Sequence, residues 1–154
     1  MDMVYPPPGL KPRNAAMPNT QAQSKVLGSE LELGNVLFVL FIPSKDKHGK
    51  DLKDAELWIS AAGDKLTELF GGATEMPPAK GKWYNEETGK IIAESVVLIH
   101  SYATEARAND EKRIKVLAEF LHRMGRDTNQ GEVAVVIDGV FHRIRKFKPG
   151  GAKK

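Results

Sequence analysis

Apolar and polar positions follow patterns that predict two elements in the first half of the chain. Residues 35–42, NVLFVLFI, are almost continuously apolar and rich in β-branched and aromatic side chains, which is typical of a covered strand. Residues 51–69 repeat apolar side chains at intervals of three and four, which predicts an amphipathic helix. We expect Asp51 to cap its start and Gly71 with Gly72 to end it, because glycine tolerates the left-handed conformation of a C-cap.

Three further patterned segments occupy the second half. The first is one strand of a predicted hairpin, whose other strand precedes residues 85–89, and Pro77 with Pro78 place that other strand at a sheet edge or force a break in it. Residues 90–102, KIIAESVVLIHSY, form the longest strand pattern in the chain. A second amphipathic helix follows over residues 109–124, with Asn109 as its N-cap and Gly125 at its end. The pattern of residues 131–144 predicts a last strand.

The predicted elements run in the order strand, helix, strand, strand, helix, strand. This order indicates an α+β domain with the ferredoxin-like split βαβ plan (βαββαβ), in which two helices cover one face of a four-stranded antiparallel sheet. The first and third strands are central in that plan, and residues 36–42 and 91–99 are the most apolar runs of the chain. The sheet face without helices would be apolar, so we expect a homodimer or a partner protein to cover it.

Composition divides the chain into one domain with a polar segment at each end. Residues 1–30 are rich in proline, asparagine, glutamine and alanine, so we expect a flexible N-terminal arm. A length of 154 residues fits one domain, which we place at residues 31–147. Residues 148–154 form a basic C-terminal tail.

Positive charge is concentrated near the C-terminus. Of 23 lysines and arginines, six lie between residues 143 and 154, and the remaining 17 are outnumbered by 20 acidic residues. A basic segment of this kind attracts phosphate groups locally. Nucleic-acid binding through the sheet face and the tail is therefore one functional alternative, and its candidate residues are Arg143, Arg145, Lys146 and Lys148.

Several kinds of chemistry lack the residues they require. The chain has no cysteine, which excludes disulfides and thiolate sites, and its four histidines lack the spacing of metal ligands. No glycine-rich phosphate motif occurs, so we expect neither a metal nor a cofactor. The longest apolar run is too short to cross a bilayer and the N-terminus lacks a secretory pattern. These features predict a cytoplasmic protein without membrane contact.

The third predicted strand carries the candidate catalytic residues. Glu94, His100 and Tyr102 are an even number of residues apart, so their side chains share one face of the strand. Glu94 and His100 are separated by about 20 Å along a strand, far beyond the approximately 3 Å that an acid–base pair requires. A site therefore needs a group from a neighbouring strand, such as Trp83. A small enzyme or ligand-binding protein with a pocket near these four residues is another alternative.

The expected register of the hairpin gives Glu94 a structural interpretation as well. If residues 85–89, NEETG, form the whole loop, Lys80 lies opposite Glu94 and Trp83 lies opposite Ile91. Opposite charges across an antiparallel pair stabilise a sheet by about 0.2–1 kcal/mol. Lys80 is thus an ion-pair partner in this interpretation, whereas Lys80 and Trp83 are ligand-binding candidates in the other.

A set of short motifs resembles small uncharacterised bacterial proteins of predicted ferredoxin-like fold. The motifs are FGGxT after the first helix, GxW before the turn, a glutamate at the start of the long strand, and NQGEV entering the last strand. The resemblance covers residues 35–144 and implies the fold, but no established activity. The matching positions are Phe70, Gly71, Gly72, Thr74, Gly81, Trp83, Glu94 and residues 129–133.

These features together predict a small non-enzymatic interaction module. It would dimerise, or dock on a partner protein, through the sheet face that the helices leave open. The enzyme or ligand-binding alternative and the nucleic-acid alternative both remain open on the sequence alone.

Overall fold

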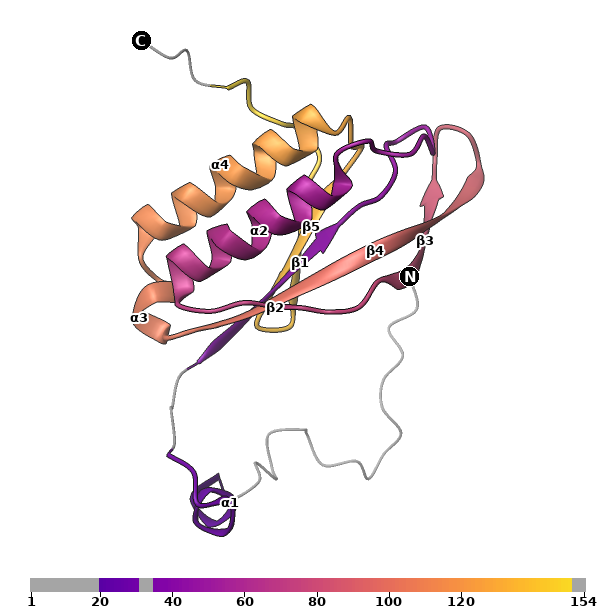
Figure 1. Ribbon diagram of the computed structural model, residues 1–154. Helices are drawn as coiled ribbons and strands as arrows, with labels where there is room; N and C mark the ends of the chain where they lie inside the picture. Colours follow the sequence, from indigo (N-terminus) through magenta and orange to yellow (C-terminus); the bar gives the residue numbers. More distant parts are fainter. Residues whose placement is uncertain (1–19, 31–34, 151–154) are drawn as a thin grey trace, which may run out of the picture. The chain divides into compact units, whose positions relative to one another are not determined.

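A computed structural model describes residues 20–30 and 35–150, which fall into two units (Figure 1). The first unit, Met1–Leu33, contains one described helix, α1 (Thr20–Leu27). The second unit, Gly34–Lys154, contains every other described element.

The predicted division into arm, domain and tail stays a prediction. Residues 1–19 of the predicted arm and residues 151–154 of the predicted tail lie outside the described part of the chain.

Seven described strands and helices of the second unit fall in the segments whose periodicity predicts them, and the remaining described elements are short. In this unit, described elements include both strands and helices. In chain order these elements are β1 (Val36–Ile42), α2 (Ala55–Phe70), β2 (Thr74–Glu75), β3 (Ala79–Asn85), β4 (Lys90–Ala103), α3 (Glu105–Ala108), α4 (Glu111–Asp127), β5 (Val133–Ile137) and β6 (Val140–Ile144).

One antiparallel sheet of six strands runs through this unit. Its strand order is β2-β4-β1-β5-β6, and β3 also pairs with β4. The predicted α+β class is confirmed, and so are the inner positions of the first strand and of the long strand. The predicted number of four strands is wrong.

Two interruptions account for the additional strands. Residues 131–144 form a hairpin rather than one strand, because Asp138 and Gly139 adopt φ values of 50° and 82° and reverse the chain between β5 and β6. The second predicted strand is divided at Pro77 and Pro78 into β2 and β3, since proline has no N–H to donate to a sheet. Both parts pair with β4.

The hydrophobic core lies between the sheet and two helices. α2 and α4 run side by side across one face of the sheet (Figure 1). Beneath them, Phe38, Leu40 and Ile42 of β1 are at most 1% exposed, and the ring of Phe70 stacks on Phe38 with centroids 4.3 Å apart. The helices contribute Ile59, Ala62, Leu66 and Leu69 from α2 and Leu117, Phe120, Leu121 and Met124 from α4.

The opposite face of the sheet, called the open face below, carries apolar side chains without a helix above them. Phe141 is 49% exposed and Tyr102 is 64% exposed, and the ring centroids of Phe41 and Phe141 lie 6.3 Å apart. Glu94 lies on the same face, further along β4. By register, the apolar part of the open face and its flanking residues include Leu37, Val39 and Phe41 of β1, Leu98, His100 and Tyr102 of β4, Val136 of β5, and Phe141 of β6.

The start of α2 differs from the prediction, whereas its end agrees with it. Asp51 forms an antiparallel bridge with Lys45 and therefore stays extended, so the helix begins at Ala55 with Asp54 as its N-cap. Gly71 takes a left-handed conformation with a φ of 98°, as predicted for the C-cap.

The ends of α4 also differ from the prediction. Asn109 is the C-cap of the short helix α3, and the N-cap of α4 is Asp110, whose side chain accepts the N–H of Lys112. Gly125 does not end the helix, which continues to Asp127.

Gly125 instead provides space for the segment that follows β6. A Cβ at this position would overlap the ring of Phe147. The N–H of Lys148 donates to Nδ1 of His122 at 3.0 Å, and the guanidinium of Arg126 donates to the Lys148 carbonyl. The absence of a side chain at Gly125 thus allows the C-terminal segment to pack on α4.

We expect Gly125→Ala to lower the free energy of unfolding by about 1–3 kcal/mol, because the new Cβ overlaps the Phe147 ring. In a Phe147→Ala background, the same change should raise the free energy of unfolding by about 0.5–1 kcal/mol, since alanine is the better helix former. Chemical denaturation of the wild type, both single variants and the double variant measures both effects. The same sign in both backgrounds would contradict this packing.

Candidate functional site

The hairpin of β3 and β4 is paired one residue away from the predicted register. Lys80 lies opposite Ser95, and the residue opposite Glu94 is Gly81. A shift of one residue moves a side chain to the other face of a sheet, so Lys80 and Glu94 lie on opposite faces. The predicted ion pair between Lys80 and Glu94 is therefore wrong.

The register differs because the hairpin loop is one residue shorter than predicted. Asn85 pairs with Lys90, which leaves residues 86–89 as the loop. Asn85 Oδ1 accepts the N–H groups of two loop residues at 3.0 and 3.2 Å. Its side chain thus closes the turn while its backbone remains in the strand, and Trp83 lies opposite Ile92.

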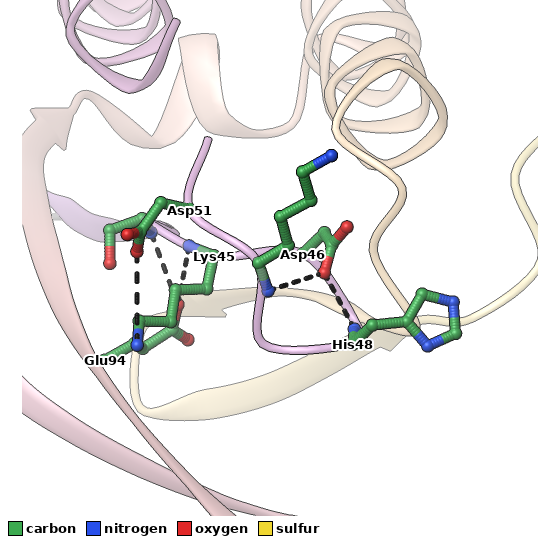
Figure 2. A network of polar contacts seen from close by, with 7 residues as sticks. Lys45, Asp46, His48, Asp51 and Glu94 are labelled. Atoms are coloured by element: carbon green, nitrogen blue, oxygen red, sulfur yellow. Dashed lines mark hydrogen bonds and ion pairs between the residues drawn. The ribbon is translucent and has the colours of Figure 1, made fainter. Parts of the chain in front are cut away.

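Glu94 is bound to the main chain that follows β1. Its Oε2 accepts the N–H of Ser44 at 3.3 Å and the N–H of Lys45 at 3.2 Å (Figure 2). Both bonds use the same carboxylate oxygen, and no donor among the described residues reaches Oε1. Within the described residues, the second oxygen of this half-buried carboxylate therefore accepts no hydrogen bond.

Burial raises the pKa of the Glu94 carboxyl, because a partly buried site solvates the charged form poorly. The N–H groups of Lys45 and Ser44 and the positive charge of Lys45 lower the pKa, but the net shift is upward. The Lys45 ammonium also faces Asp51, whose Oδ1 lies 4.0 Å from Nζ (Figure 2). Glu94 therefore holds a proton more readily than a surface glutamate does.

A compact turn orders the loop next to Glu94. Asp46 Oδ1 accepts the N–H of His48 at 2.8 Å and the N–H of Lys50 at 3.0 Å. Burial acts to raise the pKa of Asp46, but these two N–H groups and the charge of His48 lower it, and the net shift is downward. The imidazole of His48 points away from the Asp46 carboxylate in Figure 2, and the hydrogen bond from His48 to Asp46 comes from its backbone N–H.

Two side-chain amides and one backbone carbonyl, from the β3–β4 hairpin and the turn after α4, hold this loop in place. Asn85 Nδ2 donates to the Lys47 carbonyl at 3.2 Å, and the Lys47 N–H donates to the Asn129 carbonyl at 3.0 Å. Gln130 Nε2 donates to the Lys45 carbonyl at 2.9 Å. The loop after β1, the β3–β4 hairpin and the turn after α4 therefore meet around Glu94.

Sequence reasoning missed Asn85 and Gln130 as parts of this site. Asn85 is only 8% exposed, and a buried amide needs hydrogen-bond partners. Polar residues beside predicted strand ends, as in NEETG and NQGEV, are the sequence feature that could have identified both.

The other predicted catalytic and ligand-binding residues are distributed along the sheet. Trp83 shares the face of Glu94 on the neighbouring strand. His100 lies opposite Val39 and Tyr102 opposite Leu37, and a six-residue separation places His100 about 20 Å from Glu94. The structure thus brings Trp83 close to Glu94 and leaves the other two further along β4, where a functional role stays a prediction.

The predicted basic residues differ in their contacts: the two arginines form ion pairs, and the two lysines form none with another described residue. Arg143 and Arg145 lie 3.8 and 3.0 Å from the carboxylate of Glu132. Lys148 is held to α4 by its main chain, and Lys146 is exposed. Nucleic-acid binding through these residues stays a prediction.

Membrane and metal features were sought in the described part of the chain. None of its helices is long and apolar enough to span a membrane. Within the same residues, no group of three or more histidine, aspartate or glutamate side chains is arranged to hold a metal ion.

The solved structures that resemble this chain in fold include two of phage SAM lyases. One is a phage SAM lyase in complex with S-methyl-5'-thioadenosine, with a TM-score of 0.57, 16% identity, and coverage of 77% of this chain and 95% of the lyase. The other is a phage SAM lyase in the apo state, with a TM-score of 0.52, 17% identity, and coverage of 79% and 98%. No protein-family model matches the sequence, and no curated protein does so either.

This likeness corrects two predictions. The predicted resemblance to small uncharacterised bacterial proteins is wrong, since the solved structures that are similar in fold include those of a phage SAM lyase. The prediction of a non-enzymatic interaction module is wrong for the same reason. The alternative of a small enzyme or ligand-binding protein has the better support.

We expect the free energy of unfolding of Glu94→Gln, minus that of the wild type, to increase as the pH rises from 4 to 7. The folded-state pKa of Glu94 is raised, so the folded wild type binds more protons than the unfolded chain within the titration range. Its stability therefore falls as the pH rises through that range, whereas the amide of the variant does not titrate. Glutamine keeps an oxygen for the two N–H donors, which preserves the local geometry.

Urea denaturation of both proteins at intervals of one pH unit measures this difference. The contributions of all titrating groups that the two proteins share cancel in the subtraction. A difference that is constant, or that moves in favour of the wild type with rising pH, would contradict the environment described for Glu94.

Proposed function

We propose that this protein is a small enzyme that binds S-adenosylmethionine (SAM) or S-methyl-5'-thioadenosine and cleaves SAM at its sulfonium centre. The observation that carries this proposal is the fold similarity, which extends over 95% of the ligand-bound phage SAM lyase and 98% of the apo form. Because one fold supports many functions, the residues around Glu94 have to supply the chemistry.

We also infer that the domain follows the ferredoxin-like split βαβ plan, with additional strands. The order β1, α2, β3, β4, α4, β5 matches that plan along the chain. The neighbours β4-β1-β5 support it in space, and β2 and β6 are then the additions.

Cleavage of SAM by a lyase changes the charge of the nucleoside. The bond between sulfur and the amino acid carbon breaks, and its electron pair passes to sulfur. The sulfonium thereby becomes the neutral thioether of S-methyl-5'-thioadenosine. The amino acid fragment loses a proton or closes on its own carboxylate, so no water is added. The site has to bind a positively charged substrate and release a neutral nucleoside.

Glu94 and Lys45 have charges that match the amino acid part of SAM. The Glu94 carboxylate has a free oxygen for the positively charged groups, and partial burial strengthens such an attraction. The Lys45 ammonium, in a side chain that is 34% exposed, offers a partner for the substrate carboxylate. Trp83, on the same face as Glu94, offers an aromatic ring for a base to stack on.

We expect Glu94→Gln to weaken SAM binding at least about tenfold, because a charge-assisted hydrogen bond contributes about 1.5–3 kcal/mol. Binding of S-methyl-5'-thioadenosine, which lacks the positive charges, should weaken less. Isothermal titration calorimetry with each nucleoside measures binding, and chromatography of S-methyl-5'-thioadenosine released from SAM measures cleavage. Glu119→Gln, which alters an exposed carboxylate on α4, is the matched control and should behave as the wild type.

A wild-type protein that binds neither nucleoside at millimolar concentration would contradict the proposed function. If Glu94→Gln weakened the binding of both nucleosides equally, Glu94 would not recognise the positive charge of SAM. It would then contact a part of the ligand that the two molecules share.

We further infer that a second copy of the chain covers the open face. Most of this face is apolar. Of its charged side chains, Glu94 is bound to the main chain of Ser44 and Lys45, and Arg143 at its edge is paired with Glu132. Two copies can therefore meet without strong repulsion between like charges. Phe41 and Phe141, whose rings are in contact, would lie within the apolar part of such an interface.

We expect light scattering at tens of micromolar to give a mass above the 17.0 kDa of one chain. Phe141→Glu should shift the protein to the monomer, because it places a charge within the apolar interface. Val140→Glu is the matched control, since Val140 is also exposed but its side chain lies on the other face of β6. A monomeric wild type, or an equal effect of both substitutions, would contradict this assembly.

A further inference from the structure

We propose that Gln130 is a positioning residue for the Glu94 carboxylate and acts through the main chain of Lys45. The inference rests on the proposed function, since it concerns the same site. Gln130 Nε2 donates to the Lys45 carbonyl at 2.9 Å, and the Lys45 N–H donates to Glu94 Oε2 at 3.2 Å. A single residue therefore connects the side-chain amide to the carboxylate.

Gln130 is itself held against the end of α4. Its backbone N–H donates to the Gly125 carbonyl at 2.9 Å, and its Nε2 also donates to the Thr128 carbonyl at 3.2 Å. The side chain is half-buried, which restricts its rotamers. The amide is therefore fixed relative to the helix before it contacts Lys45.

Other tethers of the loop act on other atoms. The Leu52 N–H donates to the Ser44 carbonyl at 2.9 Å and the Asp46 N–H donates to the Lys50 carbonyl at 2.8 Å, one on each side of Lys45. Asn85 and Asn129 both bind the main chain of Lys47, two residues beyond Lys45. Among the described residues, Gln130 is the side chain that binds the Lys45 carbonyl. Without it, the peptide between Lys45 and Asp46 keeps only the bond from the Asp46 N–H to the Lys50 carbonyl, and the neighbouring N–H that contacts Glu94 is held less firmly in its direction. A binding group gains from such support because its orientation is set before the ligand arrives.

The charged groups next to Glu94 allow this coupling to be measured. Lys45 is the charged residue that acts on Glu94, and Asp51 lies on the other side of the Lys45 ammonium. The Lys45 N–H stabilises the ionised form of Glu94 and lowers its pKa. Loss of that N–H contact should therefore move the titration of Glu94 to higher pH.

The experiment compares Gln130→Met with Thr128→Val in the full-length protein. Methionine keeps the size of glutamine but has no N–H to donate. Valine at position 128 removes a hydrogen bond from the same turn to the Met124 carbonyl and leaves Gln130 in place. Carboxyl carbon NMR follows the titration of Glu94 in each protein, without any ligand.

We expect the Glu94 midpoint to move to higher pH in Gln130→Met and to stay at its wild-type value in Thr128→Val. An unchanged midpoint in Gln130→Met would overturn the inference. Equal shifts in both variants would also overturn it, because they would reflect general loosening of the turn.

A second measurement uses the wild type and does not depend on whether Gln130→Met folds. The Lys45 backbone amide and the Gln130 side-chain amide should both shift in NMR spectra with the midpoint of Glu94, and neither shift should occur in Glu94→Gln. A Gln130 amide that does not respond to the Glu94 titration would overturn the inference.

Calorimetry separates this inference from the proposed function. If the wild type binds SAM, we expect Gln130→Met to bind it about fivefold more weakly, the effect of one net hydrogen bond. Unchanged affinity together with a shifted Glu94 midpoint would overturn the functional part of the inference. A wild type that does not bind SAM would contradict the proposed function, while the NMR result would still decide the coupling between Gln130 and Glu94.

Discussion

The antiparallel pairing of β1 with β4 is the constraint on which the rest of this structure depends. It extends from Val36 opposite Ala103 to Ile42 opposite Val97 and decides which alternate side chains face α2 and α4. A shift of one residue would turn the buried side chains of β1 to the open face. The same register places the chain after Ile42 beside Glu94, so the candidate site is a consequence of how the core is packed.

Local periodicity was sufficient to predict the elements that make up this core. β1, β4, α2 and α4 each bury a regular set of side chains, and that regularity is visible in the sequence. The strand count was wrong because Asp138 with Gly139 interrupt a segment whose hydrophobic pattern looks continuous, and because both parts of the strand that Pro77 and Pro78 break pair with β4. The helix starts were misplaced because Asp51 and Asn109 have other partners, which no local pattern records.

The candidate site was predictable only in part. Glu94 could be identified as a carboxylate within an apolar strand, but its partners could not. Ser44 and Lys45 are about fifty residues away and contribute backbone N–H groups, which every residue but proline has. Whether Lys80 or these N–H groups are the partners of Glu94 depends on a difference of one residue in the length of the hairpin loop. The side chain of Asn85 closes the shorter loop. Tertiary contacts of this kind leave little trace in a single sequence.

The packing of Phe147 against Gly125 also determines the direction in which the chain leaves the domain. Because this segment is held on α4, the last described residues lie on the helix side of the sheet (Figure 1). A tag or carrier protein joined at the C-terminus would thus extend from the helix layer. Attachment of the protein to a sensor surface through such a tag would direct the open face away from that surface, where a second copy can still reach it.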